Sequence, residues 1–202
     1  MAAAALVLYV LWAALAFGWR TIVQHRRTGD SGLRLHAPLW SLQWWAKLAF
    51  AVAIVIGFAA PIAAVASLKN VGSLNSTPLH VAGPVVTIAA IAFTLVAQLS
   101  LGESWRIRVD PNERTALVAR GQYRYVRNPI FTVLVITAVG LAMMIPNIIS
   151  IIGLVTLIAA LEIQVRKVEE PYLLDAHSDT YRTYARTVGR FVPSIGELAD
   201  EQ

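Results

Sequence analysis

The chain of 202 residues contains no cysteine, and only 14% of its residues are charged. The absence of cysteine excludes disulfides, thiolate metal ligands and cysteine nucleophiles. An ordinary soluble domain carries about a quarter charged residues. The low charge, together with 57% hydrophobic residues and a mean hydropathy of +0.60, therefore predicts an integral membrane protein.

Several familiar site patterns are also missing. The four histidines are far apart and show no metal-ligand spacing, so we expect no metal partner. The glycines form neither a GxGxxG nor a Walker pattern, which argues against a Rossmann or P-loop nucleotide site. The net charge of +5 does not indicate a nucleic-acid partner, because the basic residues follow a membrane topology.

Long uncharged stretches alternate with basic segments. The first, Met1 to Trp19, is followed rather than preceded by positive charge, so it is expected to be a retained span and not a signal peptide. The next two expected spans are Leu48 to Leu68 and Val81 to Leu101. Pro61 is expected to kink or break the former, and Pro84 fits the first turn of the latter.

The uncharged stretch from Asn128 to Leu161 decides the topology. A single helix of this length would measure about 50 Å, whereas a hydrocarbon core measures about 30 Å. Two helices that turn at Pro146–Asn147 would each measure about 24 Å. With this hairpin, every Lys and Arg except Lys69 falls on one side, so the positive-inside bias favours it.

The expected fold is therefore all-α: a polytopic integral membrane protein with five transmembrane segments, the last two forming a helical hairpin, followed by cytoplasmic C-terminal helices. Residues 1–102 would supply three spans. Residues 103–202 would hold a binding loop, the hairpin and an amphipathic tail from Pro171 to Val188. We expect the protein to lie in the plasma (inner) membrane, with its N-terminus outside and its C-terminus and active site in the cytoplasm.

Two polar clusters bracket the hairpin, and folding it brings them to one membrane surface. The first runs from Gly121 to Phe131; on composition alone it fits interfacial anchoring by tyrosine and arginine. In the second, Glu162, Arg166 and Glu169 share one helix face, which also fits a simple ion pair at a helix end. Because ionisable groups near the bilayer are costly and commonly functional, the two clusters together indicate a small-molecule site.

The spacing of these clusters resembles the isoprenylcysteine carboxyl methyltransferase family, to which phospholipid N-methyltransferases are related. The resemblance covers about Glu103 to Pro193. It rests on a first group of residues, Gly121, Tyr123, Val126, Arg127, Asn128, Pro129 and Phe131. A second group continues it, with Arg166, Glu169, Glu170, Leu173, Tyr181, Tyr184, Arg190 and Pro193. Asn128 and Phe131 stand where the family has His and Tyr, which argues against proton transfer by either side chain.

The resemblance implies S-adenosylmethionine as cofactor, bound at the cytoplasmic face, and a lipidic or isoprenoid acceptor entering from the membrane. It implies a cofactor site formed by Gln122, Tyr123, Val126, Arg127, Asn128, Pro129, Phe131, Glu169, Glu170, Tyr181 and Tyr184. Within it, Arg127 or a neighbouring backbone group suits the cofactor carboxylate, and Glu169 or Glu170 suits its amino group or ribose hydroxyls. Arg166 and Glu170 are the catalytic candidates, Arg166 as the partner of an acidic acceptor head.

The sequence is compatible with other functions. A phospholipid amine is an equally compatible acceptor. A non-catalytic transport or assembly protein is a further alternative, although a transporter would place polar groups near mid-membrane. In this chain the charges gather at one face, which favours an enzyme at the membrane surface.

Overall fold

The computed structural model describes residues 1–29, 37–101 and 117–199. Regular structure in these ranges is helical, apart from two isolated β-bridges. The first helix is continuous: α1 (Ala2–Ala13) passes through a π-helical turn, η1 (Ala14–Trp19), into α2 (Arg20–Thr28). The other long helices are α3 (Leu42–Val65), α4 (Thr77–Leu101), α5 (Pro129–Met144), α6 (Ile148–Gln164) and α7 (Glu170–Thr187). Shorter turns are η2 (Gly72–Leu74), η4 (Gly121–Arg124) and the π-helical η5 (Val165–Glu169).

Four of these helical stretches are long and apolar enough to cross a membrane, which indicates an integral membrane protein. They are Ala2–Thr28, Leu42–Val65, Thr77–Ser100 and Ile148–Thr187. The helix α5 is apolar but shorter, with 16 residues and a length of about 24 Å. The expected count of five spans, and the expected orientation, stay predictions.

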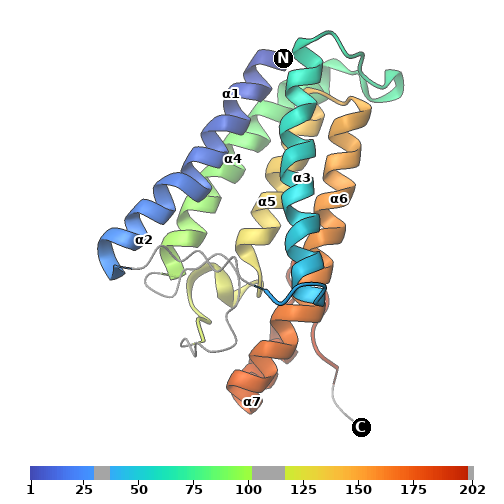
Figure 1. Cartoon of the computed structure of the whole chain (residues 1–202). Helices are drawn as coiled ribbons and strands as arrows, with labels where there is room; N and C mark the ends of the chain where they lie inside the picture. The colour runs from blue at the N-terminus through green and yellow to red at the C-terminus, as the bar shows by residue number, and fades with distance from the viewer. Residues whose placement is uncertain (30–36, 102–116, 200–202) are drawn as a thin grey trace.

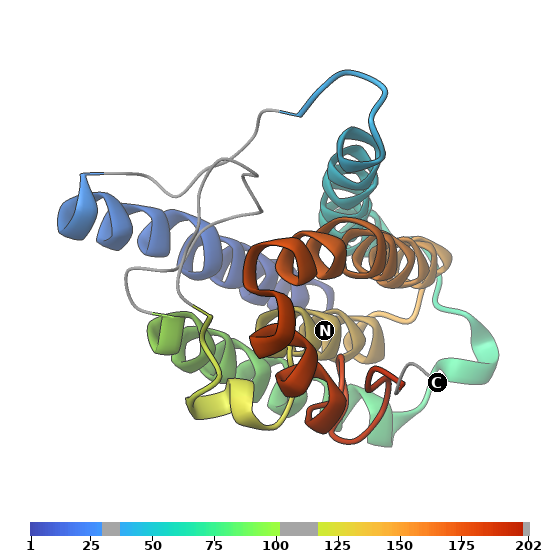
Figure 2. The same ribbon diagram turned by 90° about the horizontal axis from the view of Figure 1, so that it is seen from below.

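The helices form a bundle with two distinct ends (Figure 1). The N-terminus and the α5–α6 turn lie at one end, and α7 with the C-terminal segment lies at the other (Figures 1 and 2). Within the bundle, α4 packs extensively on α5, and α3 packs extensively on α6. The contact between α5 and α6 is much smaller, and α1 lies against both pairs. The bundle is thus two close helix pairs with a looser seam between them.

Small residues bring α4 and α5 into backbone contact. A Cβ added at Gly140 would lie 2.4 Å from Oγ1 of Thr87 and 2.9 Å from its backbone nitrogen. A Cβ added at Gly83 would lie 2.8 Å from the carbonyl oxygen of Gly140. Such close approach between helices is typical of membrane proteins, where dispersion contacts replace the hydrophobic driving force.

The α5–α6 turn is fixed by buried hydrogen bonds. Asn147 caps α6 by accepting from the backbone N–H of Ser150 at 2.9 Å, and its Nδ2 donates to the carbonyl of Ala60 at 3.1 Å. The hydroxyl of Ser150 donates to the carbonyl of Ile145 at 2.8 Å. The break expected at Pro146–Asn147 is therefore present, and its polar groups are paired although they are buried.

Three helix boundaries differ from expectation. The first helix continues past Trp19 to Thr28, where Gly29 ends it in the left-handed conformation and donates to the carbonyl of His25. The helix α3 does not break at Pro61: the proline lies inside the helix, which continues to Val65. The helix α4 begins at Thr77, so Pro84 lies inside it instead of in its first turn.

Two basic residues that lie between the first two expected spans are helical and buried in the structure. Arg20 lies in α2 with no exposed surface, and Lys47 lies in α3 with 7% exposure. Glu103 and the expected domain boundary at residues 102/103 lie outside the described residues. So do four of the basic residues that support the expected topology: Arg34, Arg106, Arg108 and Arg114.

Candidate functional site

The C-terminal segment folds back onto the start of α5. The backbone N–H of Arg127 donates to the carbonyl of Gly189 at 2.8 Å, and the N–H and Nδ2 of Asn128 both donate to the carbonyl of Arg190 at 3.1 Å. The hydroxyl of Thr132 donates to the carbonyl of Phe191 at 2.8 Å. These bonds fix the chain after α7 against the segment that carries Arg127.

Gly189, whose carbonyl accepts the hydrogen bond from Arg127, has no room for a side chain, which explains why this position is a glycine. A Cβ added there would lie 2.0 Å from the carbonyl oxygen of Val192. The turn that follows is closed by the backbone N–H of Arg190, which donates to the carbonyl of Ile195 at 2.8 Å. The geometry directs the Arg190 side chain to Glu170.

Three charged residues meet where these segments converge. The guanidinium of Arg127 lies 3.1 Å from Glu170, between its Nη1 and the carboxylate Oε1. Arg190 binds the same carboxylate in a bidentate manner, with Nε 2.7 Å from Oε1 and Nη2 3.0 Å from Oε2. The side chains of Arg127, Glu170 and Arg190 are only 2%, 10% and 12% exposed. The hydrogen bonds to Glu170 raise the pKa of Arg190 above its ordinary value despite the opposing effect of burial.

Arg127 is held rigidly yet retains an unused donor. Its Nη1 donates to the hydroxyl of Tyr181 at 3.3 Å, and its Nη2 donates to the carbonyl of Gly196 at 2.5 Å. Its buried Nε has no hydrogen-bond partner. Two guanidiniums share one carboxylate, so this group of three carries one positive charge. A buried cation with an unused N–H is suited to an anionic group such as a carboxylate.

Two tyrosines of α7 flank the charged group. The rings of Tyr181 and Tyr184 lie edge to face with centroids 6.2 Å apart. The hydroxyl of Tyr184 donates to the carbonyl of Tyr123, which ties α7 to η4. The side chain of Tyr123 is itself buried, and burial raises the pKa of its phenol, with smaller contributions from Tyr184 and Glu169. Tyr123 therefore remains neutral at physiological pH.

A π-helical turn, η5, precedes Glu170. Such turns are rare and occur frequently at functional sites. Within it, Glu169 accepts a hydrogen bond from Nε2 of the buried Gln164 at 3.1 Å. Glu169 lies near enough to Tyr123 and Tyr181 to affect both phenols electrostatically. The turn thus brings a second carboxylate beside the group of Arg127, Glu170 and Arg190.

The remaining cofactor candidates lie around this group. Oε1 of Gln122 accepts from the hydroxyl of Ser100 at 2.7 Å, at the end of α4. Val126 and Pro129 are buried on either side of Arg127, and Phe131 packs against the hydrophobic core. The structure therefore brings the candidate cofactor residues into one region at the end of the bundle that carries α7.

Arg166 is the one predicted site residue that lies apart from this region. Its side chain is 52% exposed and pairs with Glu162 one helical turn earlier. This is the simple ion pair that the sequence also allowed. Arg166 does not join the Arg127, Glu170 and Arg190 group, and it stands on the solvent side of η5.

Residues 83–175 match the model of the isoprenylcysteine carboxyl methyltransferase (ICMT) family. This segment is an ICMT-family domain. The match begins within α4 and includes the whole hairpin, Arg127 and Glu170, but ends before Tyr181 and Arg190. No curated protein sequence matches the chain.

The ICMT-family domain indicates methyltransferase activity, and the apolar helices indicate that it operates as a membrane protein. Arg190 is among the residues that carry the family resemblance, but the sequence alone did not place it in the site. The signal that pointed to it was the Arg190–Pro193 pair after the amphipathic tail. Its role depends on the fold-back of residues 188–198 and is visible only in three dimensions.

Proposed function

We propose that the chain is an S-adenosylmethionine-dependent methyltransferase that acts on a lipidic acceptor, of the isoprenylcysteine-carboxylate or another isoprenoid or lipid type, at the membrane face carrying α7. One observation carries the proposal. The ICMT-family domain contains a buried guanidinium, that of Arg127, which has an unused Nε and shares the carboxylate of Glu170 with Arg190.

The donor set fits the amino-acid part of this cofactor. Its carboxylate matches Nε of Arg127, because charge-assisted hydrogen bonds to guanidinium are strong and directional. Its ammonium or ribose hydroxyls match the carboxylate of Glu169, which is the neighbour of Glu170 in the sequence. Aromatic faces attract cations, so Tyr181 and Tyr184 are suited to the sulfonium and Tyr123 and Phe131 to the adenine.

The cofactor, when bound, supplies an electrophilic methyl group on a positively charged sulfur. The protein's part is positional and electrostatic, since transfer of a methyl group needs in-line approach and little covalent assistance. Glu170 holds Arg127 and Arg190 in place and so acts as a positioning residue for the cofactor carboxylate. The exposed Arg166 is our candidate for the acidic head of the acceptor. An acceptor carboxylate is already nucleophilic and needs no base.

We further propose that the end carrying α7 faces the cytoplasm. The basic residues described at that end include Arg120, Arg124, Arg127, Arg166, Lys167, Arg182, Arg186 and Arg190. Lys69 follows α3 at the opposite end. This asymmetry follows the positive-inside bias.

The test is a methyl-transfer assay on the full chain in lipid nanodiscs, with S-adenosylmethionine labelled in its methyl group. Separate acceptors would be a prenylated cysteine, a phosphatidylethanolamine and an isoprenoid alcohol. We expect label to enter a lipidic acceptor with wild type and with Arg124→Lys, an exposed control three residues from the site, but far less with Arg127→Lys. Folded wild type that labels no acceptor, or equal activity in Arg127→Lys, would count against the proposal.

A further inference from the structure

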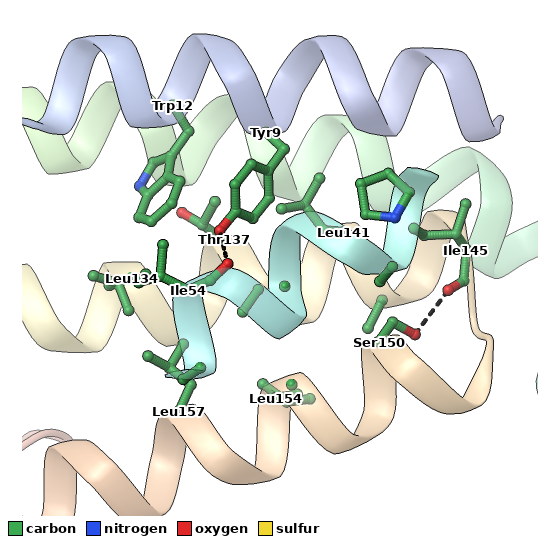
Figure 3. Close-up of a pocket in the computed structure, with 17 residues that line it drawn as sticks. Tyr9, Trp12, Ile54, Leu134, Thr137, Leu141, Ile145, Ser150, Leu154 and Leu157 are labelled. Atoms are coloured by element: carbon green, nitrogen blue, oxygen red, sulfur yellow. Dashed lines mark hydrogen bonds between the residues drawn. The ribbon is translucent and has the colours of Figure 1, made fainter. Parts of the chain in front are cut away.

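An apolar cavity lies in the seam between the two helix pairs. Its walls come from α3 and α6 on one side and α5 on the other, with Tyr9 and Trp12 of α1 over it (Figure 3). Its volume is about 530 Å³ when the space at its open side is included. Both α1 and α3 lie outside the ICMT-family segment.

The cavity occupies the half of the bundle that carries the α5–α6 turn. Along α5 its lining runs from Leu134 to Ile145, about 16 Å at 1.5 Å per residue. Along α6 it runs from Ser150 to Leu157, about 10 Å. One leaflet of a bilayer contributes about 15 Å of hydrocarbon, half of the core thickness. The cavity therefore has the depth of a single leaflet, and Arg127 lies beyond its far end, at the opposite end of the bundle.

The chemistry of the lining favours hydrocarbon over water. Three hydroxyl groups line the cavity, and each donates to a backbone carbonyl: Tyr9 to Ile54 at 2.6 Å, Thr137 to Val133 at 2.8 Å, and Ser150 to Ile145 at 2.8 Å. Nε1 of Trp12 has no partner, but it lies on the side of the ring away from Tyr9 (Figure 3). A buried water needs two to four polar partners, and these walls offer few.

We propose that this cavity binds one acyl chain of a membrane lipid from the leaflet at the α5–α6 turn. The chain fills the seam between the α4–α5 and α3–α6 pairs, which otherwise meet loosely. The lipid headgroup lies at the surface beside the turn, and the chain end reaches Leu134 and Leu157 near mid-membrane. This site is separate from the methyl-transfer site, so either proposal can fail without the other.

The test uses the full chain in vesicles of phosphatidylcholine, of which a fraction carries a photoreactive diazirine near the end of one acyl chain. After illumination, labelled residues are located by mass spectrometry. We expect label on buried lining residues such as Leu141 and Thr137, in addition to residues on the exposed face such as Ile136. Label confined to exposed residues would overturn the proposal, and this arm needs no variant.

A second experiment fills the cavity with a larger side chain. Ala142 lines it from α5 and is half-buried, whereas Ala159 is exposed on α6. We expect Ala142→Leu to lose label on Leu141 and Thr137 while Ala159→Leu keeps it, with folding of both checked by thermal unfolding. Unchanged label in folded Ala142→Leu would contradict the proposal. Displacement of the label by a prenylated cysteine would also overturn it, because the cavity would then belong to the methyl acceptor.

Discussion

The guanidinium of Arg127 lies 3.1 Å from the carboxylate of Glu170, although Arg127 precedes the apolar hairpin in the sequence and Glu170 follows it. Folding of α5 against α6 brings these two residues together. The C-terminal segment completes the group, because Arg190 binds the same carboxylate and the carbonyl of Gly196 accepts a hydrogen bond from Arg127. The site is therefore assembled from three segments that are distant in sequence, and each depends on the others.

Removing the shared carboxylate should destabilise the protein more than removing one arginine. Loss of one partner of a buried ion pair costs about 3–5 kcal/mol. We expect a loss near that range for Glu170→Ala, because two guanidiniums then face each other. The loss should be smaller for Arg127→Ala, because Glu170 keeps both bonds to Arg190. Unfolding in mixed micelles measures both, with the exposed Arg124→Ala as control; the reverse order would contradict the shared-carboxylate arrangement.

Arg166→Ala should separate acceptor binding from cofactor binding. Its exposed pair with Glu162 contributes less than about 1 kcal/mol to stability, so the variant should fold normally. We expect unchanged affinity for S-adenosylmethionine and a raised KM for an acidic acceptor. Calorimetry and initial-rate kinetics measure the two quantities. A large loss of cofactor affinity would assign Arg166 to the cofactor site instead.

Gly140→Ala should loosen the α4–α5 pair. The added methyl group would overlap the hydroxyl and backbone of Thr87, and overpacking of this kind costs about 1–3 kcal/mol. Gly18→Ala is the matched control, because a Cβ there meets nothing within 4 Å. In a helix that change should be neutral or stabilising by up to about 1 kcal/mol. Equal unfolding midpoints for the two variants would show that the close contact is unimportant.

Asn128→His should change the pH profile of the reaction. Asparagine does not titrate, whereas an unperturbed histidine has a pKa of about 6.5. Nδ2 of Asn128 donates to the carbonyl of Arg190, and a ring N–H of histidine can replace that donor. We expect kcat/KM of the variant to show an additional inflection near neutral pH that wild type lacks. Superimposable profiles would mean that position 128 is remote from the reacting groups.

Much of the fold was predictable from the sequence. The uncharged stretches located the long apolar helices, and the length of the last stretch indicated the turn at Pro146–Asn147. The end of the first helix was missed because the expected span ended at Trp19, where the uncharged stretch ends. A buried arginine can continue a helix, and the stop signal was Gly29 after the basic residues His25, Arg26 and Arg27.

The site was predictable as a region but not as a set of contacts. The two clusters flank the hairpin and meet, as their positions indicated. Helical spacing placed Arg166 and Glu169 on one face, but η5 changes the helical register at this point, and Arg166 points to solvent. The place of Arg190 depends on a fold-back that no periodic pattern encodes.

The most direct test of the account is calorimetric titration of the folded, detergent-purified chain with S-adenosylmethionine and S-adenosylhomocysteine. Wild type and Arg124→Ala should bind saturably. Arg127→Lys should bind at least about tenfold more weakly, because a hydrogen bond to a charged group contributes about 1.5–3 kcal/mol. Absence of saturable binding to folded wild type in the presence of lipid, or equal affinity in Arg127→Lys, would contradict the assignment of Arg127 to the cofactor carboxylate.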